Sequence, residues 1–150
     1  MADNVSPEVR SRMMAGIRAT NTKPELILRK GLHARGFRFR LHDRKLPGKP
    51  DIVLPRYHAV IQAHGCFWHG HECLLFKWPK TREEFWRTKI ARNRVVDERN
   101  KEFLINEGWR QATVWECALK GRTRLPIDEV LSHCENWLMS DKQTVEISGG

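Results

Sequence analysis

The chain has 150 residues, the usual size of one domain, and this length can bury a sizeable core without disulfides. Lys and Arg number 27 against 18 Asp and Glu, a formal charge of 27 − 18 = +9, which indicates a polyanionic partner, nucleic acid first. Because no segment resembles a signal-peptide core or a membrane span, we expect a cytoplasmic protein that contacts no membrane.

The first segment is typical of a helix that docks on DNA. Ser6-Pro7 supplies an N-cap and a first-turn proline, and we expect the helix to run to about residue 20. Its few large apolar residues, Met14 and Ile17 among them, are interleaved with arginines, although a frayed, solvated helix fits the same pattern. Residues 1–20 are therefore interpreted as an N-terminal DNA-contacting helical arm.

A second helix and three strands are expected next. Thr22 and Glu25 have the spacing of a capping box, and Gly36 is expected to end the helix. Apolar periodicity then predicts strands at 37–41, 51–54 and 58–63.

Residues 64–80 fit no periodic pattern and concentrate His, Cys and aromatic side chains. We interpret them as a functional loop. A long helix is expected to begin at Thr81, which has capping-box spacing to Glu84, and to end at Glu107.

The rest of the chain completes an α/β domain. Residues 109–115 predict a strand, and 126–139 predict a last helix. We expect residues 21–140 to form one domain with a small mixed β-sheet flanked by helices, and residues 141–150 to be a flexible tail.

The cysteines indicate a metal site, because disulfides are rare in a reducing compartment. Cys66, His71 and Cys73 lie in the functional loop, and Cys117 follows 117 − 73 = 44 positions later at the end of a predicted strand. Such a set suits tetrahedral zinc, which could hold an irregular loop in shape. The alternative is a group of buried cysteines with a histidine nearby by chance. Cys134, on the last helix, is expected to be a core thiol.

One carboxylate and two histidines indicate a catalytic site. Asp51 begins one predicted strand, His64 follows the next, and His69 lies five positions further on. Phosphodiester hydrolysis uses a hard cation with oxygen ligands, for which Asp51 is the natural anchor. The histidines could position or deprotonate water, or protonate the leaving oxygen. Glu25 could complete the site, although a capping box would explain it as well.

Three separated motifs resemble the very short patch repair endonucleases, the Vsr family. They are Leu46-Pro-Gly-Lys-Pro-Asp51, His64-Gly-Cys-Phe-Trp-His69-Gly-His-Glu-Cys73 and Trp115-Glu-Cys117-Ala-Leu. The resemblance spans nearly the whole chain. It implies a restriction-endonuclease-like fold of the PD-(D/E)xK type with a structural zinc site. It also implies magnesium-dependent nicking 5′ to the thymine of a T:G mismatch, in repair of deaminated 5-methylcytosine.

The resemblance further implies roles for individual residues. Asp51 resembles the magnesium-bridging carboxylate, His64 and His69 the catalytic histidines, and Glu25 an acidic residue near the site. The implied zinc ligands are Cys66, His71, Cys73 and Cys117. Ala63 stands where the family often has Thr, so a magnesium ligand supplied by its backbone carbonyl would survive the change, but a hydroxyl role would not.

Large aromatic side chains suit intercalation at a mismatch, where separating base pairs costs least. The residues in question are Phe67, Trp68 and Trp86, which resemble the family's intercalating platform; core packing is the alternative, above all for Trp86. Met14 and Ile17 would approach from the other groove. Lys89 and Asn93, one helical turn apart, could reach bases together.

The implied partners are double-stranded DNA with a T:G mismatch and a MutL-type mismatch-repair protein, and we expect a monomer in the bacterial cytoplasm, acting at the nucleoid. Two alternatives remain open. One is a zinc-stabilised module that recognises distorted DNA without cutting it, and the other is a restriction-type nuclease that acts on matched DNA.

Overall fold

A computed structural model describes residues 22–150 of the chain. The expected N-terminal arm, with Met14 and Ile17, lies outside the described residues. Within the described part, no helix is long and apolar enough to cross a membrane.

A five-stranded mixed sheet forms the centre of the fold, in the order β1-β2-β3-β4-β5. Its strands are β1 (Arg40–Leu41), β2 (Ile52–Leu54), β3 (Ala59–His64), β4 (Arg110–Trp115) and β5 (Thr144–Ile147). The first three pair antiparallel, and β4 lies parallel to both β3 and β5. The expected small mixed sheet is therefore confirmed.

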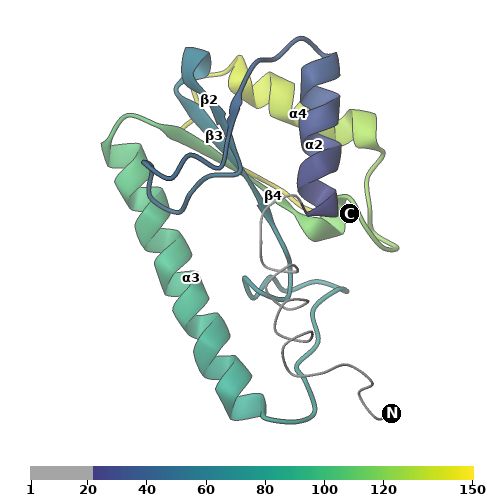
Figure 1. The fold of residues 1–150 in the computed structure, drawn as a ribbon. Helices are drawn as coiled ribbons and strands as arrows, with labels where there is room; N and C mark the ends of the chain where they lie inside the picture. The colour runs from purple at the N-terminus through teal and green to yellow at the C-terminus, as the bar shows by residue number, and fades with distance from the viewer. Residues whose placement is uncertain (1–21) are drawn as a thin grey trace, which may run out of the picture.

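Helices cover both faces of this sheet (Figure 1). They are α2 (Lys23–Ala34), α3 (Glu83–Asn106) and α4 (Ile127–Leu138). α2 and α4 pack together on one face, where Leu28 and Trp137 meet Ile52 and Ile61 in the main core. On the other face, Leu104 of α3 packs against Val53 and Val60. Successive side chains of β2 and β3 thus point to opposite faces of the sheet and pack against different helices, as strand geometry requires.

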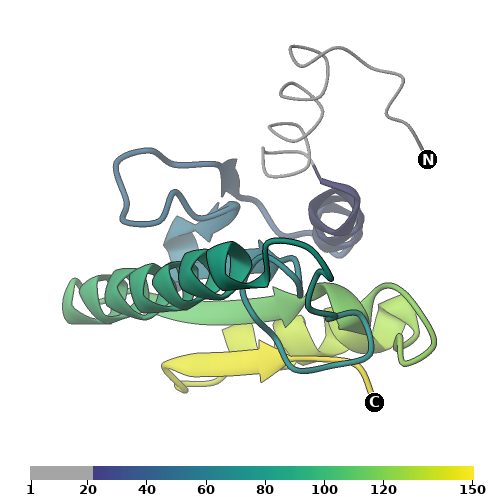
Figure 2. The same cartoon turned by 90° about the horizontal axis from the view of Figure 1, so that it is seen from below.

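Most of α3 lies outside the core. The helix has 24 residues, of which only Ile90 and Leu104 are buried. At about 1.5 Å per residue it reaches far past the short strands, and Figures 1 and 2 show its N-terminal end beside the loop that follows β3. A site formed by the functional loop would therefore have α3 as one of its walls.

The expectation of a flexible tail at 141–150 is wrong for Thr144–Ile147, which form β5. They pair in register with β4 from Gln111 to Val114. Ile147 is buried and Val145 packs against the main core. The physical reason is that β4 is otherwise an edge strand, and β5 satisfies its outer hydrogen-bonding groups.

Three local expectations also need correction. Strand β1 contains only two of the five residues expected between 37 and 41, and Phe37 lies outside it, buried in the core beside Tyr57. The Thr22 side chain makes no capping hydrogen bond, and the N-cap of α3 is Arg82, also without a side-chain cap. The capping-box explanation of Glu25 is thus weakened, and the buried position of this side chain must be explained otherwise.

Candidate active site and metal cluster

Two carboxylates and one histidine converge where α2 meets the start of β2. We call Glu25, His42 and Asp51 the acidic centre; their ligand atoms all lie within 4.8 Å of one another. Glu25 is 1% exposed, and its Oε2 lies 2.6 Å from His42 Nε2 and 3.0 Å from an Arg29 guanidinium nitrogen. Asp51 Oδ2 accepts a 2.7 Å hydrogen bond from the Ala63 backbone N–H, which ties β2 to β3.

The environment of Asp51 opposes its negative charge. Burial raises the pKa of this carboxyl from 3.8 to about 6, partly offset by the Ala63 hydrogen bond, and the nearby Glu25 carboxylate raises it further. A divalent cation that takes oxygen ligands stabilises buried carboxylates that repel one another, because both carboxylates can bind it. The acidic centre therefore fits a metal ion.

A second group joins the end of β3 to α3. The rings of His64 and His69 stack in parallel with centroids 3.8 Å apart, and His69 Nδ1 lies 2.5 Å from Asp97 Oδ2. Burial lowers the pKa of His64 from 6.5 to about 3, and the neighbouring His69 lowers it as well. His64 is thus a neutral imidazole at neutral pH.

Residues of both groups line one cleft. Its volume is about 850 Å³, and its wall includes Glu25, Asp51, His64, His69 and Asp97. The structure therefore brings together the four residues that we expected to be catalytic. Sequence reasoning missed two residues of these groups: Asp97, which lines the cleft, and His42, which contacts Glu25.

Asp97 left a signal in the sequence. Lys89, Asn93 and Asp97 follow one another at intervals of four, so they share one face of α3. In the structure the Asn93 side-chain amide donates a 2.9 Å hydrogen bond to the Trp68 carbonyl, which holds the functional loop against this face. No comparable pattern marks His42.

The three predicted intercalating residues touch one another. Phe67 lies with ring centroids 5.4 Å from Trp68 and 5.3 Å from Trp86, and the two tryptophans are 5.6 Å apart. All three are only partly buried, and none belongs to a buried core cluster of the described residues. Because Trp68 also lines the cleft, this aromatic cluster stands at its edge.

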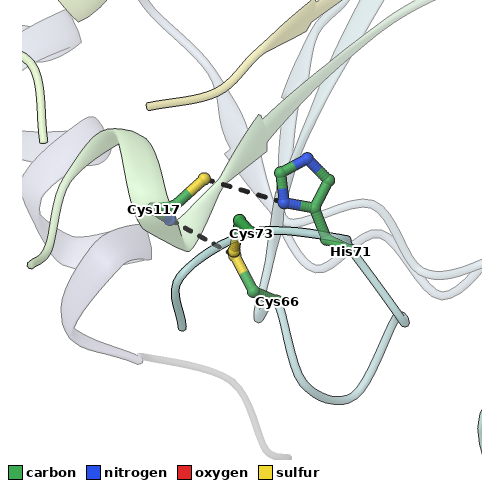
Figure 3. A group of neighbouring side chains, drawn as sticks. All are labelled: Cys66, His71, Cys73 and Cys117. Atoms are coloured by element: carbon green, nitrogen blue, oxygen red, sulfur yellow. Dashed lines mark hydrogen bonds between the residues drawn. The ribbon is translucent and has the colours of Figure 1, made fainter. Parts of the chain in front are cut away.

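Four further side chains, three cysteines and a histidine, form a compact group (Figure 3). The ligand atoms of Cys66, His71, Cys73 and Cys117 lie within 4.8 Å of one another, so this cysteine–histidine cluster could hold a metal ion. Three of the residues come from the functional loop, and Cys117 comes from the 3-10 turn Glu116–Ala118 after β4. His71 stacks on Trp115 at 4.2 Å.

The donor set fits a tetrahedral divalent ion. Burial raises the pKa of the Cys66 and Cys117 thiols and lowers that of His71, so a bound cation would have to offset the cost of buried thiolates. The Cys117 and Gly149 N–H groups each donate a 3.3 Å hydrogen bond to a cysteine sulfur, Cys66 and Cys117 respectively, and such bonds stabilise thiolate charge. A chance grouping is a poor explanation for this convergence.

Cys134 lies apart from this cluster, in the main core between α4 and the sheet, where burial raises its pKa to about 12. The expectation of a core thiol is confirmed.

The mixed sheet, with a carboxylate and histidine cleft between β2, β3 and α3, defines a restriction-endonuclease-like protein. A family model described as DNA mismatch endonuclease Vsr matches residues 2–75. The chain is 42% identical over 147 residues to the DNA mismatch endonuclease Vsr of Escherichia coli, an alignment that covers 98% of this chain and 94% of the relative. The chain therefore belongs to the Vsr family of DNA endonucleases, as the motifs indicated.

Two nicking enzymes are also similar. The type II nicking enzyme V.XorIIP of Xanthomonas oryzae pv. oryzae is 50% identical over 119 residues, covering 79% of this chain and 88% of the relative. The type II nicking enzyme V.NmeAIP of Neisseria meningitidis is 43% identical over 122 residues, covering 81% and 87%. These relatives support a nuclease activity.

Proposed function

We propose that the protein nicks one strand of duplex DNA 5′ to the thymine of a T:G mismatch, by magnesium-dependent phosphodiester hydrolysis, in the repair of deaminated 5-methylcytosine. One observation carries this proposal: a single cleft, beside an aromatic cluster, is lined by Glu25, Asp51, His64 and His69. The names of the relatives, a mismatch endonuclease and two nicking enzymes, agree with it.

The magnesium ion would lie on the acidic centre. Asp51 and Glu25, with the backbone carbonyl of Ala63, are the groups that would hold it. When bound, a divalent cation neutralises charge on the phosphate and lowers the pKa of a water ligand. The Ala63 N–H hydrogen bond keeps Asp51 Oδ2 in place.

His69 is the proposed proton acceptor from the attacking water. Its Nδ1 contacts Asp97, so the proton of the neutral ring resides on Nδ1 and Nε2 is left as the basic atom. The Asp97 carboxylate also stabilises the imidazolium that forms, as in other carboxylate–histidine pairs. His64 stays neutral and stacks against His69, which holds that ring in its orientation.

Recognition of the mismatch is assigned to the aromatic cluster, assisted by Lys89 and Asn93. Phe67, Trp68 and Trp86 present partly exposed rings at the edge of the cleft. Inserting rings between base pairs costs a few kcal/mol per step and costs least at a defective pair. Zinc in the cysteine–histidine cluster would hold the loop that carries Phe67 and Trp68.

We further propose that the protein acts as a monomer in the bacterial cytoplasm, with a MutL-type protein as a partner.

A strand-mapped cleavage assay tests the proposal. Duplexes that differ only in a T:G or a T:A pair are incubated with Mg²⁺, with each strand labelled separately. We expect a single nick 5′ to the mismatched thymine, and we expect Asp51→Ala to abolish the nick while DNA binding persists.

Two outcomes would contradict the proposal in different ways. Cleavage of both strands of the matched duplex would make the protein a restriction-type nuclease. Tight binding of T:G duplex by the unaltered protein, without cleavage in any divalent metal, would make it a recognition module.

A further inference from the structure

His42 has no part in the function proposed above, although it lies inside the acidic centre. Its Nε2 atom is 2.6 Å from Glu25 Oε2, and the two side chains come from separate parts of the chain. The residue has a left-handed backbone (φ 48°), and its N–H donates a 3.2 Å hydrogen bond to the Asp51 carbonyl. The backbone hydrogen bond thus holds the His42 main chain beside Asp51, and the ring contacts Glu25.

Charge balance alone does not account for this placement. Arg29 already lies 3.0 Å from the same Glu25 oxygen that His42 contacts, so this oxygen has a permanent cation beside it. Meanwhile Glu25 and Asp51 repel each other, which helps to raise the pKa of Asp51. A divalent ion between the carboxylates would relieve this repulsion, and a ring nitrogen of His42 lies within 4.8 Å of an oxygen of each carboxylate, close enough to bind the same ion.

We propose that His42 supplies a nitrogen ligand to the divalent cation held by Glu25 and Asp51. The site is then a mixed nitrogen and oxygen set. An imidazole ligand favours first-row transition metals over Mg²⁺, which prefers oxygen and water. The acidic centre therefore takes Mn²⁺ more tightly than Mg²⁺. The inference rests on the proposed function only in placing an ion at Asp51.

The test uses Mn²⁺ as the probe, with no DNA present. The full-length protein is first given one equivalent of Zn²⁺, so that the cysteine–histidine cluster is filled. Mn²⁺ affinity is then measured from the free-ion electron paramagnetic resonance signal, and pulsed measurements detect coupling of bound Mn²⁺ to ¹⁴N. His42→Gln is the test variant, because glutamine can still hydrogen-bond to Glu25 but offers no imidazole nitrogen. His33→Gln, an exposed position on α2, is the matched control.

We expect ¹⁴N coupling in the unaltered protein and in His33→Gln, and its loss in His42→Gln. The Mn²⁺ affinity of His42→Gln should fall about 10-fold or more, the order seen when metal-site partners are removed, with a smaller loss of Mg²⁺ affinity measured by competition. A thermal melt shows that both variants are folded.

Two results would overturn the inference. The first is coupling that persists in His42→Gln but disappears in His64→Gln or His69→Gln, which would put the ion on the other histidines. The second is bound Mn²⁺ without ¹⁴N coupling in any of these proteins, which would leave His42 as a hydrogen-bond partner of Glu25. Nicking of T:G duplex is scored separately, so either result can occur with the proposed function intact.

Discussion

The position of Asp51, buried next to another carboxylate, lowers the stability of the fold. The pKa of its carboxyl is raised from 3.8 to about 6. Since the folded state binds this proton more tightly than the unfolded chain does, the associated stabilisation is full below the unfolded pKa. It is then lost as the pH rises through the folded pKa. At neutral pH the ionised carboxylate therefore destabilises the metal-free protein.

We predict that Asp51→Asn abolishes nicking and stabilises the metal-free fold at neutral pH, by on the order of 1 kcal/mol. Asparagine can still accept the Ala63 hydrogen bond but carries no charge. The stability difference should grow as the pH rises from 3.8 to about 6 and then level off. Urea denaturation across this range measures it. Asp141→Asn, at an exposed position, is the control and should show no such trend. If Asp51→Asn were less stable than the unaltered protein at neutral pH, the prediction would be contradicted.

At the scale of elements, Arg110 connects the end of α4 to the sheet. Its guanidinium donates hydrogen bonds to the carbonyls of Trp137, Leu138 and Ser140 at 3.0–3.1 Å, and to that of Tyr57 at 3.1 Å. These include carbonyls at the C-terminus of α4, which have no partner within the helix. Arg110 thus helps to fix the end of α4 and the turn towards β5, together with Ser140, whose N–H and hydroxyl also donate to the Trp137 carbonyl.

We predict that Arg110→Lys lowers the free energy of unfolding by about 2–4 kcal/mol, because an ammonium cannot satisfy several carbonyls that a planar guanidinium fork satisfies at once. Chemical denaturation measures the loss. The matched control is Arg124→Lys, where an exposed guanidinium makes a single 3.0 Å bond to Gly121. Equal losses in the two variants would show that the network around Arg110 adds nothing.

For the whole molecule, the cysteine–histidine cluster joins three parts of the chain that lie far apart in sequence. Cys66, His71 and Cys73 belong to the functional loop, Cys117 follows β4, and the Gly149 N–H reaches Cys117 from beyond β5. The same loop carries His69 and Trp68 to the cleft. Metal binding is therefore expected to order the functional loop as well as to stabilise the fold.

We predict one Zn²⁺ per chain, measured by elemental analysis of the purified protein. Cys117→Ser should lose the metal, lose at least about 2 kcal/mol of stability, and become sensitive to proteolysis between residues 65 and 80. Cys134→Ala serves as the control for general destabilisation: it creates a cavity in the main core but should keep its zinc. Full zinc content in Cys117→Ser would argue against this cluster as the site.

Local signals were enough to predict most of the fold. The apolar period of Leu28 and Leu32 places α2 on the core, and alternating apolar residues locate β2, β3 and β4 within a residue or two. Strand β5 was missed because four residues with two apolar side chains carry too weak a pattern. Its stability comes from pairing with β4, a long-range contact that the local sequence does not express.

The sequence by itself determined the chemistry available: the unusual HGCFWH block, the cysteine spacing and Asp51 are properties of side chains along the chain, and their grouping identified the family. Only the tertiary structure decided which further groups join them. Asp97 meets His69 across 28 positions, and His42 meets Glu25 across 17, because a helix and a sheet bring distant segments to one cleft. Such long-range contacts depend on the path of the whole chain, and the identity of a single side chain does not encode that path.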